Sequence, residues 1–142
     1  MDFDEFLVLL DKGTELPFDK IHQAMTSYIA IFVECNVSPP LKSLLLELIQ
    51  CALDYLSGKI DGHALLEART TAWHLFDRQE RNSPAQFSTR LVLCCLYDEQ
   101  SSEIDEMGLE FFFETLFSIA DDAAENESFK FARYLADHLE LV

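Results

Sequence analysis

The hydrophobic positions of this chain recur at helical spacing along almost its whole length. Apolar side chains return every three or four residues at 3–10, 21–32, 109–120 and 129–139. Residues spaced i, i+3, i+4 and i+7 lie on one face of an α-helix, whereas a half-buried strand alternates every second residue. The pattern predicts seven helices, at about residues 2–11, 17–35, 40–57, 62–81, 84–97, 102–124 and from about 129 onward.

Short breaks separate these helices. Pro39 and Pro40 form a rigid corner, and Gly58 ends the third helix. Asp61 and Ser83 are predicted helix caps, because their side chains can accept hydrogen bonds from free N–H groups in the first turn. Links this short place successive helices antiparallel. The predicted fold class is therefore all-α, a single-domain bundle of about seven helices over residues 1–142.

The segment at residues 91–97, Leu-Val-Leu-Cys-Cys-Leu-Tyr, is apolar around its whole circumference. A helix without a polar face is usually buried at the centre of a protein. A strand of seven residues would have the same composition, but no partner strand is visible elsewhere in the sequence. We therefore predict a buried central helix pair formed by the fourth and fifth helices, with the others packed around it.

Composition narrows the class of protein. The 142 residues are 49% hydrophobic, which suffices for one core. No window approaches the roughly 18 apolar residues of a membrane-spanning helix, and the first residues, Met-Asp-Phe-Asp-Glu, are acidic where a signal peptide is basic. The four cysteines include no C-x-x-C pair and are predicted to be reduced structural residues. We expect a cytoplasmic protein with no membrane segment.

The charge is strongly negative and unevenly placed. The formal net charge is −16, and residues 98–142 carry thirteen Asp or Glu against Lys130 and Arg133. Such a field repels nucleic acid and anionic membranes and attracts basic partners. Solubility of a phenylalanine-rich chain is the alternative explanation. We predict a basic protein partner and no binding of nucleic acid.

Five carboxylates lie opposite the apolar stripe of the sixth predicted helix. Neighbouring like charges on a helix repel one another at a modest cost, and nothing in that helix offsets the cost. A docking face for a basic surface would explain them. The predicted partner-binding residues are Glu103, Glu106, Glu110, Glu114 and Asp121.

Two arginines fall among apolar positions. Arg69 lies within the apolar arc of the fourth helix next to Trp73, and Arg90 begins the apolar segment of the fifth. A guanidinium keeps its charge, so a buried one needs a carboxylate or carbonyl oxygens. Three alternatives stay open: a buried salt-bridge network with carboxylates such as Asp77, a recessed anion-binding pocket, or side chains that extend to water.

Candidate catalytic and metal-binding patterns are weak. His63 with Glu67, and His74 with Asp77, have spacings from which helices assemble metal sites, but no H-E-x-x-H motif and no matching second helix accompany them. The sequence also contains no G-x-S-x-G motif and no glycine-rich phosphate loop. We predict no metal, no cofactor and no enzymatic activity.

The segment from Leu65 to Asp77, L-L-E-A-R-T-T-A-W-H-L-F-D, and the helix from Arg90 to Tyr97 resemble a group of small all-helical bacterial proteins. Most of that group is uncharacterised, and some members are classed as immunity proteins of toxin systems. The resemblance covers about 35 of the 142 residues. It implies an interaction protein and assigns no site residues.

Together these patterns predict a non-enzymatic, acidic binding protein of the immunity type that sequesters a basic protein. The alternative is a small-molecule-binding or enzymatic helical domain with an anion pocket around Arg69, Trp73 and Arg90. A homo-oligomer is compatible with either.

Overall fold

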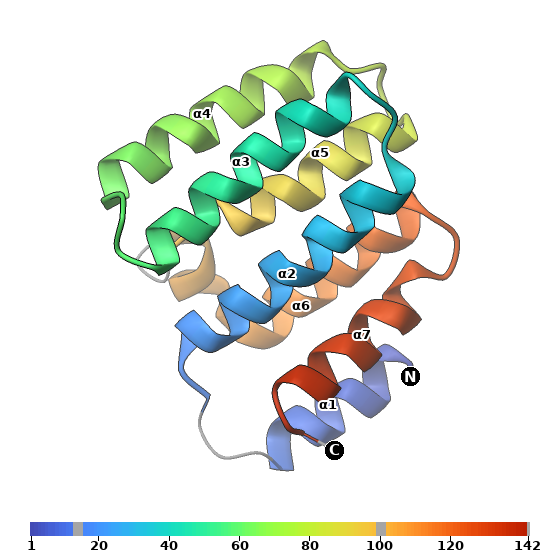
Figure 1. Ribbon diagram of the computed structural model, residues 1–142. Coiled ribbons are helices and arrows are strands. Elements are labelled where there is room, and N and C mark those ends of the chain that lie inside the picture. The colour runs from blue at the N-terminus through green and yellow to red at the C-terminus, as the bar shows by residue number, and fades with distance from the viewer. Residues whose placement is uncertain (13–15, 99–101, 142) are drawn as a thin grey trace.

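All seven predicted helices are present in the computed structural model, which describes residues 1–12, 16–98 and 102–141 (Figure 1). In chain order they are α1 (Phe3–Lys12), α2 (Phe18–Asn36), α3 (Leu41–Leu56), α4 (Gly62–Arg78), α5 (Pro84–Cys95), α6 (Ser102–Ala123) and α7 (Glu127–His138). The described ranges contain no strand, so the all-α prediction is confirmed. None of the helices found there combines the length and apolar character needed to cross a membrane.

Helices α4 and α5 begin at the two caps predicted from the sequence, Asp61 and Ser83. The Asp61 carboxylate accepts a hydrogen bond from the Ala64 N–H at 2.9 Å, and the Ser83 hydroxyl accepts one from the Gln86 N–H at 3.1 Å. Each bond satisfies an N–H group that has no partner inside its own helix. The corner before α3 contains a cis peptide bond between Pro39 and Pro40.

The centre of the bundle is α5. It packs against α2, α3, α4 and α6 (Figure 1), and all six residues from Leu91 to Leu96 are buried. Its apolar circumference therefore meets a helix on every side, as predicted from the sequence.

The prediction that α4 shares this central position is wrong. Among the described elements α4 packs only against α3 and α5, and only Leu65, Ala68 and Ala72 of its residues are buried. Its opposite face carries exposed polar side chains. The helix that pairs with α5 at the centre is α2, which has nine buried residues and also contacts α3 and α7.

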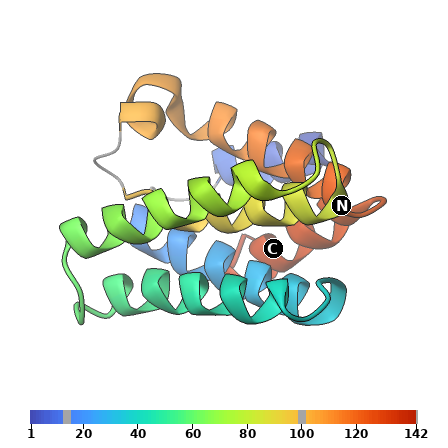
Figure 2. The same ribbon diagram turned by 90° about the horizontal axis from the view of Figure 1, so that it is seen from above.

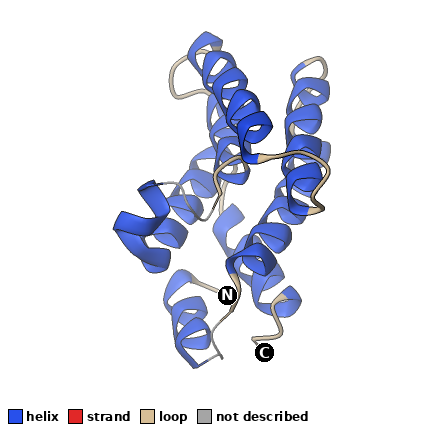
Figure 3. Ribbon diagram, turned by 90° about the vertical axis from the view of Figure 1, so that its left-hand side faces the viewer, coloured by secondary structure: helices blue, strands red, loops and turns tan. Residues whose placement is uncertain are grey.

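A cluster of phenylalanines joins the two ends of the chain. The ring centroid of Phe6 in α1 lies 5.0 Å from that of Phe113 and 5.3 Å from that of Phe117, both in α6. Phe117 also contacts Phe131 of α7 at 5.5 Å. Edge-to-face packing of this kind adds to the stabilisation from burial. Both termini consequently lie at the same end of the bundle (Figures 1 and 3).

Helix α6 is broken at Gly108. This residue has φ 80° and ψ 164°, a conformation that glycine adopts readily because it lacks a Cβ atom. Residues 102–107 form a short helical piece set at an angle to the rest of α6 (Figure 2). The predicted uninterrupted helix over 102–124 is thus two segments, and the longer one, at 109–123, covers the bundle.

The cysteines divide into two groups. Cys94 and Cys95 are buried in α5, as predicted. Burial raises the pKa of the Cys95 thiol, and that of the partly buried Cys51 thiol is raised by burial first and by nearby carboxylates second. Cys35 is exposed on α2.

Candidate functional site

Beyond the break at Gly108, α6 presents an acidic outer face. Glu110 and Glu114 are exposed and one turn apart, and Phe111, which follows Glu110 in sequence, is 47% exposed. Ser118, one turn further on, is also exposed. Within the described part of the chain, neither carboxylate has an ion pair or hydrogen bond. We call Glu110, Phe111, Glu114 and Ser118 the α6 outer face.

Asp121 has a different role from the one predicted. Its carboxylate accepts hydrogen bonds from the Ser128 N–H and from the Ser128 hydroxyl, each at 2.8 Å. Asn126, at the N-cap position of α7, has φ 57° and makes no side-chain cap bond. Asp121 therefore caps α7 from the preceding helix. Its two oxygens are engaged within the fold.

The predicted single stripe of five carboxylates is also interrupted. Glu103 and Glu106 belong to the short segment before Gly108, and their side chains lie outside the described residues. The change of direction at Gly108 breaks the 100° rotation per residue on which the prediction depended. Of the five predicted residues, the structure brings Glu110 and Glu114 together on one exposed face.

Arg69 and Arg90 do meet in one cluster, which two aromatic residues complete. The Arg69 Cζ atom lies 4.4 Å from the ring centroid of Tyr97, and the Arg90 Cζ atom lies 5.1 Å from a ring of Trp73. The Trp73 Nε1–H donates a hydrogen bond to the Tyr97 hydroxyl at 3.1 Å. The order Arg69, Tyr97, Trp73, Arg90 alternates cation and ring, and all four side chains are half-buried.

The predicted buried salt-bridge network is not what holds these arginines. Arg69 Nη1 donates to the Leu96 carbonyl oxygen at 3.4 Å, and in the described ranges neither guanidinium pairs with a carboxylate. Asp77 is exposed and takes no part in the cluster. The aromatic faces and a carbonyl at the end of α5 accept the positive charge instead. The cluster therefore fastens α4 to the end of α5.

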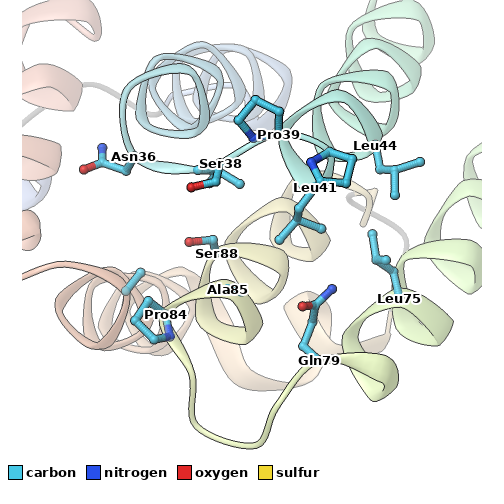
Figure 4. A pocket seen from close by; sticks show the side chains of 13 residues that line it. Asn36, Ser38, Pro39, Leu41, Leu44, Leu75, Gln79, Pro84, Ala85 and Ser88 are labelled. Atoms are coloured by element: carbon cyan, nitrogen blue, oxygen red, sulfur yellow. The ribbon is translucent and has the colours of Figure 1, made fainter.

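Three clefts lined by described residues open on the surface. The first lies between the corner at Pro39 and Pro40 and the link from α4 to α5, with a volume of about 520 Å³ (Figure 4). The second, about 460 Å³, lies between α3 and α4, and the third, about 540 Å³, between the start of α2 and the end of α7. None of the three is lined by Arg69, Trp73, Asp77 or Arg90. The alternative prediction of an anion pocket at the arginines gains no support from them.

The first pair of the weak metal-binding pattern on α4 forms a contact at the exposed surface of the helix. His63 Nε2 lies 3.2 Å from the Glu67 Oε1 atom, and both side chains are largely exposed, at 78% and 72%. His74 lines the second cleft, and Asp77 does not. Over the residues that the structure describes, no three His, Cys, Asp or Glu side chains gather as a ligand set.

A buried carboxylate was missed by the sequence reasoning. Glu127, at the start of α7, is only 6% exposed, and the Tyr28 hydroxyl of α2 donates a hydrogen bond to it. The Lys130 Nζ atom lies 4.0 Å from its other oxygen. The pKa of Tyr28 is raised, first by burial and then by the hydrogen bond to Glu127 and its charge. No local pattern marks Glu127, because an acidic residue in the first turn of a helix is common.

His22 is the second buried polar group that the sequence did not reveal. It lies on α2, and its Nε2–H donates to the carbonyl oxygen of Cys95, near the end of α5. Burial lowers the pKa of the imidazole, and the hydrogen bond and the charge of Asp98 oppose that change. A neutral imidazole thus satisfies a carbonyl group that α5 leaves free at its end.

The chain matches no known family, no curated protein and no solved structure. The resemblance to small bacterial helical proteins stays a prediction. The function must therefore be inferred from the geometry and chemistry of the described residues.

Proposed function

We propose that this protein is a non-enzymatic binding protein that holds a basic protein on the α6 outer face. One observation carries the proposal: Glu110 and Glu114 are exposed carboxylates without partners in the described residues, and the neighbouring Phe111 is 47% exposed. Each half of this arrangement has a distinct role in binding.

The carboxylates select the partner. The chain has a net charge of −16, and a field of that sign raises the encounter rate with basic proteins and disfavours acidic ones. Neither Glu110 nor Glu114 must break an internal ion pair before it meets a lysine or arginine. The electrostatic part of the interaction is therefore available from the first contact.

Phe111 supplies affinity. Aromatic residues near the centre of an interface are frequent hot spots, because they bury a large apolar area with few rotatable bonds. The opposite side of this helix is anchored in the core by Phe113, Leu116 and Phe117, which are at most 3% exposed. A rigid helix loses little conformational entropy when a partner binds, and this preserves affinity.

The proposed role is of the immunity type: the protein covers the basic active surface of a toxin and so blocks it. This choice of partner follows the predicted resemblance of residues 65–77 and 90–97 to small helical bacterial proteins, some of which are classed as immunity proteins. We also propose a cytoplasmic location, in keeping with four free cysteines. No catalytic step belongs to this role.

Capture from the native cells tests the proposal. The bait is the wild-type protein, and the matched baits are Glu110→Lys/Glu114→Lys on the outer face and Glu34→Lys/Glu80→Lys on exposed positions elsewhere, which change the charge equally. We expect a basic protein on the wild-type and control baits, released by salt, and absent from the outer-face variant. Retention of the same protein by all three baits, or of no basic protein by any, would contradict the proposal.

A further inference from the structure

The cleft beside the corner at Pro39 and Pro40 has the features of a ligand site. Its volume of about 520 Å³ lies within the range of small-molecule pockets. The α2 to α3 corner, α3, the end of α4 and the start of α5 form its walls (Figure 4). Residues of the α6 outer face are not among those that line it.

Ser88 is the decisive group in this cleft. The residue is only 4% exposed, and its side chain points from α5 into the cleft (Figure 4). Among the described residues its hydroxyl has no hydrogen-bond partner, although the neighbouring Thr89 hydroxyl bonds to the Ala85 carbonyl oxygen at 2.8 Å. The hydroxyl keeps some exposure to the cleft, where it can donate a hydrogen bond to a bound molecule or accept one from it.

Two more neutral polar groups face the same space. The Gln79 amide enters from the end of α4 and the Ser38 hydroxyl from the opposite wall (Figure 4). Within the described ranges neither side chain has a hydrogen-bond partner. Like Ser88, each can both donate and accept. The cleft therefore offers three neutral polar side chains to an uncharged ligand.

Apart from Asn36, the remaining lining is apolar and stiff. It includes Leu41, Leu44 and Leu75, together with three proline rings, at 39, 40 and 84. Prolines restrict the backbone, so the wall is preformed. Among the residues that the structure describes, no Asp, Glu, Lys, Arg or His lines the cleft. A charged ligand would lose hydration there without gaining a counter-charge, and an anion would also meet the net charge of −16.

We propose that this cleft binds a small uncharged molecule that has an apolar body and an amide or hydroxyl head, with the head hydrogen-bonded to Ser88 and Gln79 and the body against Leu41, Leu44 and Leu75. The site is independent of the α6 outer face. A protein that loses partner binding through Glu110 and Glu114 keeps this ligand site.

A titration followed by ¹H–¹⁵N NMR tests the site with three probes that share a cyclohexyl ring and differ in charge: cyclohexanecarboxamide, cyclohexanecarboxylate and cyclohexylammonium. We expect the amide to shift the backbone signals of Ser38, Gln79 and Ser88 saturably, and the two charged probes to bind at least about 5-fold more weakly. Ser88→Ala should weaken binding of the amide by roughly 5-fold. Ser57→Ala, at an exposed serine that follows α3 and does not line the cleft, is the control and should leave the affinity unchanged.

Three results would each overturn the proposal: no saturable shifts at these residues, equal binding of the charged probes, or unchanged affinity in Ser88→Ala. The variant is expected to fold, because the hydroxyl that it removes has no partner within the described structure. If its melting temperature falls, the same titration is made with Gln79→Ala, which should weaken binding of the amide by roughly 3-fold. An unchanged affinity in Gln79→Ala would also overturn the proposal.

Discussion

Asp121 at the end of α6 accepts two hydrogen bonds from Ser128 in the first turn of α7, from the backbone N–H and from the hydroxyl, both at 2.8 Å. The residues between them include Asn126, which has a left-handed backbone with φ 57°. The carboxylate thus closes the turn and caps α7. This role distinguishes Asp121 from Glu110 and Glu114, whose carboxylates have no such internal partner among the described residues.

Asp121→Ala should destabilise the protein. Loss of a helix cap costs about 1 kcal/mol of the free energy of unfolding. Asp122→Ala removes an equal charge from the next, exposed residue, and should change that free energy by less than about 0.5 kcal/mol. Chemical denaturation of the two variants measures the difference. Equal destabilisation would show that the capping bonds contribute nothing beyond charge.

Tyr28→Phe should cost roughly 2 kcal/mol, because it removes a hydrogen bond to the buried carboxylate of Glu127 and leaves that carboxylate less well satisfied. The matched control is Tyr134→Phe. Its ring packs against Tyr28 with centroids 5.2 Å apart, and its hydroxyl makes no hydrogen bond in the described structure. We expect a change below about 0.5 kcal/mol there. Denaturation curves in which both variants lose the same stability would contradict the assignment.

Stability should also fall in alkali. The folded protein raises the pKa of Tyr28 above its usual value of 10.0, chiefly through burial. Above about pH 10 the unfolded chain releases the phenolic proton, whereas the folded protein keeps it. The unfolded state therefore binds fewer protons, and the free energy of unfolding decreases as the pH rises. One such group contributes at most about 1.4 kcal/mol per pH unit. Denaturation between pH 9 and 11 should show a shallower decline in Tyr28→Phe than in Tyr134→Phe; identical slopes would refute the pKa shift.

Arg69→Met should cost about 1 kcal/mol or less, since it removes a half-exposed contact with the Tyr97 ring and one long hydrogen bond. If the guanidinium were in a buried ion pair, its removal would leave the carboxylate partner unpaired and would lower the free energy of unfolding by about 3–5 kcal/mol. The fluorescence of Trp73, the only tryptophan, reports whether the cluster stays intact. A loss of stability in the larger range would restore the buried network that the sequence had suggested.

Much of the fold was predictable because it depends on local pattern. Apolar spacing located the helices, and the residues that precede their first turns, Asp61 and Ser83, cap them as expected. The apolar circumference of residues 91–96 correctly indicated that α5 is buried. Such features need only the chemistry of neighbours along the chain.

What could not be predicted depends on contacts across the chain. A lone glycine within a helical pattern can be helical, and only packing decides that Gly108 bends the chain. The apolar arc of α4 indicated burial of Arg69, yet the arc borders Tyr97, 28 residues away, which draws the guanidinium onto a ring face. The partner of Glu127 is Tyr28, 99 residues distant. No periodicity encodes these pairs.

The central claim is that Glu110 and Glu114 bind a basic protein. The most direct test is the dissociation constant of the captured basic protein, measured by calorimetry for wild type, for Glu110→Lys/Glu114→Lys and for the control Glu34→Lys/Glu80→Lys. We predict that the outer-face variant binds at least about 10-fold more weakly, since two attractive charges become repulsive at the contact, whereas the control stays much closer to wild type. Equal weakening of both variants would show that the net charge alone acts, and would contradict a docking face on α6.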